Sequence, residues 1–183
     1  FDTGPIIGLD IGASAVKVLQ LGKHGDRIRV ENFAIEQLEP GVVRERNIVD
    51  RDRVVAAIKS VIKKSGVKTQ KICVSISNSM AITKVLKMAA DLSDKDIGGE
   101  IEIEAGKHIP YPLSEINLDY TVLGPIENSA GMMNVLLVAS KADNINNISG
   151  LVIDAGLNPS IVDIDAYAIA RSFDLVSRKL PAQ

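Results

Sequence analysis

Apolar and polar residues alternate in patterns that divide the first part of the chain into three strands, a helix and a fourth strand. An apolar hairpin spans residues 6–21, and an alternating strand spans residues 27–38, with an irregularity at Asn32. Apolar residues then recur at helical spacing across residues 50–65, and a further strand spans residues 71–77. Three antiparallel strands followed by a helix and a strand predict an α/β fold.

The pattern changes after residue 80, where a second set of elements begins. Its members are a strand, a helix, two further strands and a helix, expected over residues 81–88, 93–108, 116–123, 132–140 and 143–155. The main pattern then resumes with a strand over residues 160–164. We therefore expect residues 81–157 to form an inserted βαββα subdomain, while residues 1–80 and 158–183 form the core.

A helix is expected to follow this strand, running from Asp165 to about Arg178. Apolar residues recur along one side of it. The residues predicted to form its inner face are Ala166, Ile169, Ala170, Phe173 and Val176.

The inserted helix that begins at Ser93 has a regular apolar side but an unusual number of glycines. Its apolar side is predicted to consist of Ile97, Ile101 and Ala105. Each glycine inside a helix costs roughly 1 kcal/mol relative to alanine. The pattern therefore indicates either close packing or a locally weak helix at three positions, Gly98, Gly99 and Gly106.

Composition narrows the classes of function. The 183 residues are 46% hydrophobic and 24% charged, with a net charge of -2, which is ordinary for a folded domain. The chain has no basic stripe, 3% aromatic residues and no tryptophan, so we do not expect it to bind nucleic acid.

The single cysteine, Cys73, lies in an apolar run and is expected to be an inert core thiol in a reducing compartment. No apolar run is long enough to cross a membrane and no signal peptide is visible, so we expect a cytoplasmic protein that meets a membrane only through partners.

The opening hairpin carries the candidate chemistry. Asp10 ends its first strand, small residues follow at Gly12, Ala13 and Ser14, and Lys17 lies on the returning strand. Backbone N–H groups in such a turn can face a phosphate, and small side chains let the phosphate oxygens come close. A carboxylate beside the turn can hold the waters of Mg²⁺, and an ammonium can neutralise phosphate charge. A surface hairpin with an incidental aspartate would also explain the motif.

The Asp-x-Gly-small-small motif resembles the first phosphate-binding hairpin of the actin-like ATPase superfamily. Many of those proteins carry a subdomain between the third strand and the first helix, but here that connection, residues 39–47, is too short for one. An insert after the fourth strand is instead similar to the FtsA and PilM families. The segments that resemble PilM proteins are residues 100–105, 108–113, 117–120 and 162–168. The implied fold is an actin-like ATPase core of the ribonuclease-H-like type with an FtsA/PilM-type βαββα insert.

This resemblance implies a nucleotide site that binds ATP with Mg²⁺. Asp10, Gly12, Ala13, Ser14 and Lys17 match half of the family's phosphate site, and Asp10 would act on the metal through water. Hydrolysis by such proteins is expected to be weak or absent.

Asp165 and the end of the sequence also affect what we expect of the ATP site. Asp165 matches, by its place between a strand and a helix, the acid or amide that orients water in catalytic relatives. A role as helix N-cap would explain it equally well.

The second phosphate hairpin and the adenosine-binding segment would lie beyond Gln183. The chain thus resembles a first half, either a fragment or a natural short form, without the second actin-like domain. We expect it to bind ATP weakly or not at all and to be inactive by itself.

The resemblance also implies a platform protein of type IV pilus biogenesis, held at the inner membrane by its partners. Its expected ligand is the cytoplasmic N-terminal tail of the inner-membrane protein PilN, lying in a groove between the core and the insert. Tyr111 and Leu113 are the expected contacts, although packing within the insert would explain both residues equally well. Other inner-membrane components of the pilus and self-association are further candidate interactions.

Two other functions belong to the same superfamily. An FtsA-like cell-division protein would need a membrane-targeting amphipathic helix, which no terminal segment here provides. A small-molecule kinase would need a substrate pocket between two large domains.

Overall fold

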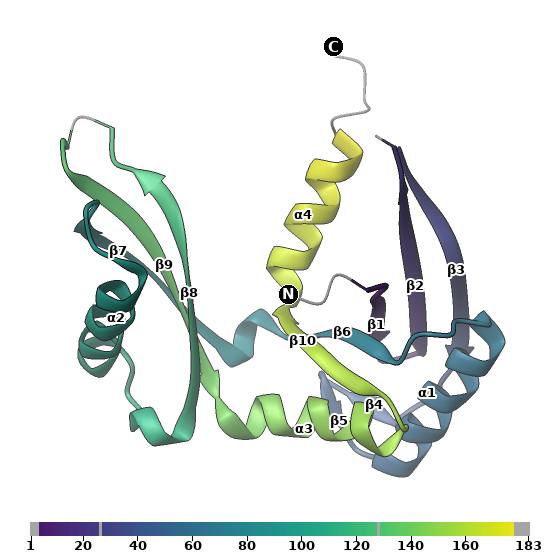
Figure 1. Ribbon diagram of the computed structural model, residues 1–183. Helices are drawn as coiled ribbons and strands as arrows, with labels where there is room; N and C mark the ends of the chain where they lie inside the picture. The colour runs from purple at the N-terminus through teal and green to yellow at the C-terminus, as the bar shows by residue number, and fades with distance from the viewer. Residues whose placement is uncertain (1–3, 26, 128, 178–183) are drawn as a thin grey trace. The chain divides into compact units, whose positions relative to one another are not determined.

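A computed structural model describes residues 4–25, 27–127 and 129–177 of the chain (Figure 1). The chain forms two compact units: unit 1 comprises Phe1–Ser77 and Asn146–Gln183, and unit 2 comprises Asn78–Ile145. Within the described residues, no helix has both the length and the apolar character needed to span a membrane.

Unit 1 contains a five-stranded mixed sheet (Figure 1). Its strands are β1 (Ile7–Ile11), β2 (Ala15–His24), β3 (Arg27–Gln37), β6 (Lys71–Ile76) and β10 (Asn158–Ile164). The order across the sheet is β10-β6-β1-β2-β3. β1, β2 and β3 form an antiparallel meander, whereas β1, β6 and β10 are parallel. The expected irregularity in the third strand is confirmed, because the β2–β3 register shifts between Gln20 and Leu21, opposite Asn32 and Val30.

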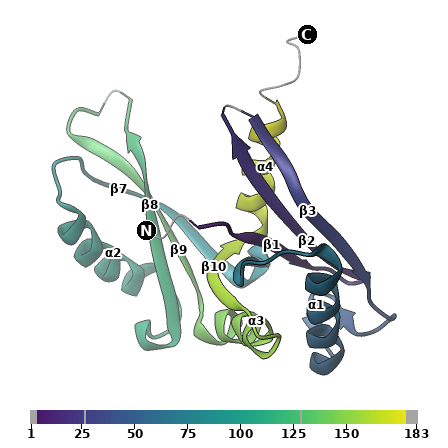
Figure 2. The same ribbon diagram turned by 45° about the vertical axis from the view of Figure 1, so that its right-hand side comes forward.

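Helices cover one face of this sheet. Helix α1 (Arg51–Ser65) begins after Asp50, whose carboxylate accepts a hydrogen bond from the Arg53 N–H, and ends at Gly66, where φ is 71°. It lies beside β2 and β3 (Figure 2). Its apolar side packs with alternate residues of the strands, including Ile7, Val16, Val18, Ile72 and Val74. Burial of these side chains holds the helix on the sheet.

Unit 2 contains a three-stranded antiparallel sheet and one helix. The strands are β7 (Ala81–Ala89), β8 (Ile116–Pro125) and β9 (Met132–Lys141), in the order β7-β9-β8. Helix α2 (Asp94–His108) packs on this sheet through Ile97, Ile101 and Ala105, as expected. Short 3-10 turns precede β7 (η1, Asn78–Met80) and β8 (η2, Leu113–Glu115).

The start of α2 is well capped, but its glycines are not required by packing. The Ser93 hydroxyl accepts a hydrogen bond from the Asp96 N–H at 3.3 Å and donates one to the Asp96 carboxylate at 2.6 Å. A Cβ atom at Gly98, Gly99 or Gly106 would meet no neighbouring atom within 4 Å. Of the two explanations for these glycines, close packing is therefore excluded, and a locally weak helix is left.

A small hairpin replaces the expected plain connector over residues 39–47. β4 (Val43–Arg44) and β5 (Asn47–Ile48) pair antiparallel around a two-residue turn. Both turn residues have positive φ, 49° at Glu45 and 66° at Arg46. Such turns usually carry Asn or Gly, so the sequence offered no turn signal here.

Helix α3 (Ala142–Asp154) differs from its expected place. The inserted subdomain was expected to extend to residue 157, but the boundary between the units falls inside this helix, after Ile145. Leu151 and Val152 are fully buried in the core of unit 1. The second half of α3 therefore belongs to the core, because its apolar side is buried there.

The predicted inner face of α4 (Asp165–Ser177) is wrong for the residues that the structure describes. Ile169 and Phe173 are 69% and 67% exposed, and Ala166 and Ala170 are also exposed. The half-buried residues of α4 are instead Asp165, Tyr167, Ala168 and Ser177. The prediction also placed Val176 on the inner face and the helix end near Arg178, but the Val176 side chain and Arg178 lie outside the residues that the structure describes. Helix α4 lies beside β10 and β6 with its apolar stripe turned to solvent.

Candidate functional site

The carboxyl ends of three parallel strands meet at one edge of the unit 1 sheet. The small-residue turn follows β1, Ser77 follows β6, and Asp165 follows β10. In open α/β sheets, ligands bind outside the carboxyl ends of the strands. This edge is therefore the first candidate site, and it brings the hairpin motif and Asp165 to the same end of one sheet.

Asp10 and Lys17 face each other at this edge. They are paired residues in the β1–β2 register, and the Lys17 Nζ lies 2.8 Å from the Asp10 Oδ2. Their side chains remain 61% and 50% exposed, respectively. The Lys17 ammonium is thus accessible to an anion, but the carboxylate already holds it and an incoming phosphate would compete for it.

The turn between these residues is tight. The Gly12 N–H donates a hydrogen bond to the Ala15 carbonyl at 3.0 Å, and the Ser14 carbonyl accepts one from the Leu38 N–H at 2.8 Å. A Cβ atom at Gly12 would lie 3.2 Å from the Ala15 oxygen and 3.8 Å from the Lys17 Nζ. The lysine ammonium therefore lies close to the turn, and Gly12 keeps that space open.

The residues of this hairpin can be compared with the contacts that phosphate and Mg²⁺ require. A small turn with an ammonium beside it fits phosphate oxygens. Among the described residues, no group of three or more metal-ligating side chains is present. Mg²⁺ commonly binds through one carboxylate, waters and substrate phosphates, so Asp10 fits an outer ligand rather than a closed metal site.

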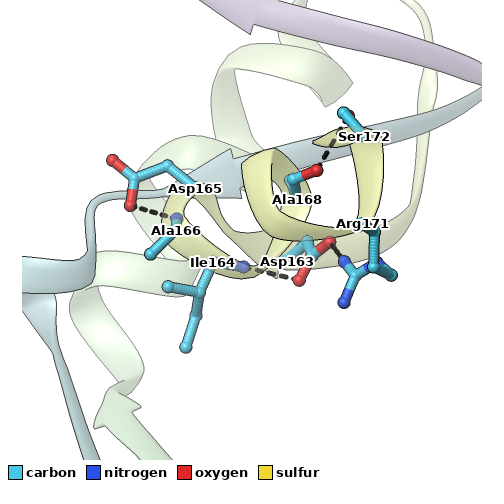
Figure 3. Close-up of polar contacts among 7 residues, drawn as sticks. All are labelled: Asp163, Ile164, Asp165, Ala166, Ala168, Arg171 and Ser172. Atoms are coloured by element: carbon cyan, nitrogen blue, oxygen red, sulfur yellow. Dashed lines mark hydrogen bonds and ion pairs between the residues drawn. The ribbon is translucent and has the colours of Figure 1, made fainter. Parts of the chain in front are cut away.

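Asp165 is held by its own helix and by an arginine from the β4–β5 hairpin. Its Oδ1 accepts a hydrogen bond from the Ala166 N–H at 2.7 Å (Figure 3). Its Oδ2 lies 3.6 Å from the Arg46 Nη1, and that guanidinium also donates to the Ser77 hydroxyl. Asp165 is the first residue of α4 rather than the residue before it.

Sequence reasoning missed two neighbours of this edge. Arg46 lies in the hairpin turn that was not predicted, because neither Glu45 nor Arg46 is a typical turn residue. Asp163 accepts a hydrogen bond from the Ile164 N–H at 2.7 Å and also binds the Arg171 guanidinium (Figure 3). The eight-residue spacing of Asp163 and Arg171 matches no local rule, because it joins a strand to the following helix.

Cys73 is less enclosed than expected. It is half-buried, because it points to the opposite side of β6 from the buried Ile72 and Val74. Desolvation, and then the nearby Asp163 carboxylate, raise the pKa of the thiol above its ordinary value. The thiol is therefore less ionised than a free cysteine, which agrees with an inert role.

Unit 2 holds a second candidate site, a pocket of about 210 Å³. It is lined by Ser79, Met80, Ala81, Ile82, Ile109, Tyr111, Ile116, Ala139, Ser140, Lys141 and Asn144. Tyr111, expected as a partner contact, is among them and remains 37% exposed. Leu113 is exposed in the 3-10 turn and does not belong to the lining that the structure describes.

Hydrogen bonds hold the polar groups of this pocket lining in place. The Ser140 hydroxyl donates to the Met80 carbonyl at 2.7 Å, and the Asn144 amide donates to the Ser140 hydroxyl at 3.2 Å and to the same carbonyl at 3.4 Å. The Lys141 ammonium lies 4.2 Å from the centroid of the Tyr111 ring. The pocket lining thus combines apolar side chains with hydrogen-bonded polar groups and a cation.

Comparisons with known proteins show the family of the chain and its fold. The sequence matches the family described as type IV pilus assembly protein PilM over residues 8–183. A solved structure described as the PilM–PilN type IV pilus biogenesis complex matches with a TM-score of 0.78 at 21% identity, covering 93% of this chain and 50% of that one. The cytoplasmic domain of EpsL, an inner-membrane component of the type II secretion system of Vibrio cholerae, matches with a TM-score of 0.53 at 10% identity, covering 90% and 59%.

These matches confirm the expected fold class, an actin-like α/β fold. The chain spans about half the length of the chain that it matches in the PilM–PilN complex.

Proposed function

Because the chain belongs to the family of the type IV pilus assembly protein PilM, we propose that it is a cytoplasmic platform of that machine and binds the N-terminal tail of PilN. The observation that carries this proposal is the fold that it shares with a PilM chain solved with PilN. The proposed position at the inner membrane follows from PilN, since the tail of an inner-membrane protein would hold the platform there.

The pocket in unit 2 is the proposed peptide site. Ile82, Ile109 and Ile116 provide an apolar wall that can receive a side chain of an extended peptide. Ser140 and Asn144 are already ordered by the Met80 carbonyl, so polar peptide groups would meet a preformed surface. Sites that bind extended peptides recognise alternate side chains of the peptide and its backbone groups.

The experiment is fluorescence anisotropy of a labelled PilN N-terminal peptide titrated with this chain. We expect saturable binding, and we expect at least tenfold weaker binding by Tyr111→Ala, because this ring lines the pocket. Leu123→Ala is the matched control, since Leu123 is 54% exposed on β8 of the same unit and lies outside the lining. Failure of the folded parent chain to bind would overturn the function, whereas normal binding by Tyr111→Ala would overturn only the site.

The hairpin edge of unit 1 supports a second part of the proposal, a phosphate site for ATP with Mg²⁺ in the protein that includes a second domain. Lys17 and the turn at Gly12, Ala13 and Ser14 would contact phosphate, and Asp10 would hold metal-bound water. When bound, Mg²⁺ would neutralise phosphate charge. Asp165, fixed beside Arg46, is the proposed group that orients a water molecule.

One phosphate hairpin supplies only part of the contacts of a nucleotide cleft. Each charge-assisted hydrogen bond contributes roughly 1.5–3 kcal/mol, so the loss of half of them leaves little affinity. Isothermal calorimetry of the 183-residue chain with Mg-ATP should therefore show weak or no binding and no hydrolysis. Micromolar affinity would contradict this part of the proposal.

A further inference from the structure

Gly12, Ser77 and Asp165 lie in one row just beyond the ends of three neighbouring parallel strands. The β1–β6 register, continued past the ends of both strands, brings Gly12 level with Ser77. The β10–β6 pairing runs to the last residue of both strands, so the next residues, Asp165 and Ser77, are level as well. Neighbouring strands lie about 4.8 Å apart. A group that contacts Ser77 is therefore next to the small-residue turn of the phosphate hairpin.

Arg46 reaches this row from the β4–β5 hairpin. Its Nη1 donates a hydrogen bond to the Ser77 hydroxyl and lies 3.6 Å from the Asp165 Oδ2. The Arg46 side chain is nevertheless 64% exposed, and no contact within the described residues engages its Nε or Nη2. A guanidinium carries five N–H donors in a planar fork. The other donors of Arg46 can therefore bind an anion while Nη1 keeps its contacts.

The backbone that places Arg46 at this edge has an uncommon conformation. Glu45 and Arg46 have φ values of 49° and 66°, and no other non-glycine residue in the described part of the chain has a positive φ. Residues held in the left-handed region cluster at functional sites, where surrounding contacts keep them in place. Here the contacts of the Arg46 side chain with Ser77 and Asp165 hold the turn at the edge of the sheet.

Two cations thus flank the Gly12 turn, one on each side of β1. Lys17 comes from β2, and its Nζ would lie 3.8 Å from a Cβ atom at Gly12. Arg46 lies on the opposite side, over the end of β6. Each cation is paired with a carboxylate, Lys17 with Asp10 and Arg46 with Asp165. An anion at the turn would therefore meet an ammonium on one side and a guanidinium on the other, and a guanidinium matches phosphate oxygens in bidentate geometry.

We propose that Arg46 is a second phosphate-binding cation of this chain, and that it acts with Lys17 on a polyphosphate held at the Gly12 turn. This inference rests on the phosphate site proposed above and adds to it a residue from a different element. The ligand class is a polyphosphate, whose successive phosphate groups can contact both cations at once. If Arg46 were only a clamp between the β4–β5 hairpin and the start of α4, its loss would leave phosphate affinity unchanged.

Nuclear magnetic resonance of the ¹⁵N-labelled 183-residue chain, titrated with sodium tripolyphosphate, tests this proposal. The backbone N–H signals of Gly12 and Ser14 report binding at the turn. The Arg46 Nε–H signal reports the guanidinium at mildly acidic pH, where this proton exchanges slowly enough to be observed. Sodium chloride at matched ionic strength corrects for screening. Arg46→Asn removes the cation but suits the turn, because asparagine tolerates a left-handed φ. Arg44→Asn is the matched control, since Arg44 is an exposed arginine of the same hairpin.

We expect the Gly12, Ser14 and Arg46 signals to shift together and to saturate with one dissociation constant in the millimolar range. Arg46→Asn should weaken binding about tenfold, since a charge-assisted hydrogen bond is lost, and Arg44→Asn should bind like the parent.

Two kinds of result would overturn the proposal. An unmoved Arg46 Nε–H signal while Gly12 shifts, or equal affinity of Arg46→Asn and the parent or of the two variants, would overturn the role of Arg46 and leave the phosphate turn in place. No shift at Gly12 and Ser14 would overturn the phosphate site itself, and the role of Arg46 with it. If Arg46→Asn does not fold, Arg46→Gly is used in the same comparison, because glycine adopts a positive φ without strain.

Discussion

At the residue scale, the Asp10–Lys17 pair is exposed to solvent although it lies on central strands of the sheet. An exposed ion pair contributes about 0–1 kcal/mol to stability. Both side chains are about half exposed or more, so screening by solvent weakens their attraction. The fold therefore does not depend on the pair, which leaves both residues available to a ligand.

Replacing Asp10 by alanine should change binding more than folding. We expect the midpoint of thermal unfolding to shift by no more than a few degrees, because little buried contact is lost. In a protein that includes a second domain, as proposed for ATP binding, Asp10→Ala should weaken Mg-ATP binding at least tenfold by calorimetry, since the metal would lose its water anchor. Asp52→Ala is the control, because it lies in the first turn of α1 and away from the hairpin. If Asp10→Ala binds Mg-ATP like the parent, the phosphate-site assignment is wrong.

At the element scale, local signals predicted most elements but could not report what covers them. Helix ends are fixed at Asp50, Gly66 and Ser93 by local side-chain and φ requirements. The β4–β5 hairpin was missed because Glu45 and Arg46 are not turn formers. The stripe on α4 was predicted correctly as apolar and wrongly as buried. Periodicity shows that a face is apolar, but only the partner determines whether it is buried.

The glycines of α2 allow a matched pair of substitutions. Gly99→Ala should stabilise unit 2 by up to about 1 kcal/mol, because Gly99 is helical and the added methyl group meets open space. Gly66→Ala should destabilise unit 1 by about 1 kcal/mol, because Gly66 has a φ of 71°. Urea unfolding followed by circular dichroism measures both. A destabilised Gly99→Ala variant would show that α2 needs flexibility or close approach at that position.

Glu36 joins β3 to α1 and should make stability depend on pH. Its hydrogen bonds with Lys64, and then with Ser60, hold the pKa of the carboxyl group below its ordinary value. Because the folded-state pKa is lowered, the stabilisation is complete above the unfolded-state pKa and is lost as pH falls through the folded-state value.

The unfolding midpoint should therefore decrease as the pH is lowered from about 6 to about 3.5. The decrease should be smaller in Glu36→Gln, which cannot ionise, than in the parent or in the control Glu45→Gln. Differential scanning calorimetry across this pH range measures the effect. Equal pH dependence in Glu36→Gln and the parent would show that the Lys64 contact does not persist in solution.

At the scale of the whole molecule, the order of elements carried more information than any single motif. The short 39–47 connection and the late insert indicated the FtsA and PilM families, and segments such as residues 108–113 favoured PilM. The family match over residues 8–183 confirms the PilM family. The sequence did not locate the boundary after Ile145, because α3 is one continuous helix whose two ends belong to different units. It also did not reveal the pocket, which joins η1, β9 and the Ile109–Tyr111 region across more than sixty residues.

Hydrogen–deuterium exchange with and without the PilN N-terminal peptide tests the central claim most directly, because one measurement reports both binding and its place. We expect slower exchange with peptide in residues 79–82 and 139–141, which line the pocket of unit 2. A scrambled peptide should leave these segments unchanged, and the α1 segment, residues 51–65, should not respond to either peptide. Unchanged exchange throughout at saturating PilN peptide, or protection only at residues outside the pocket lining, would contradict the account.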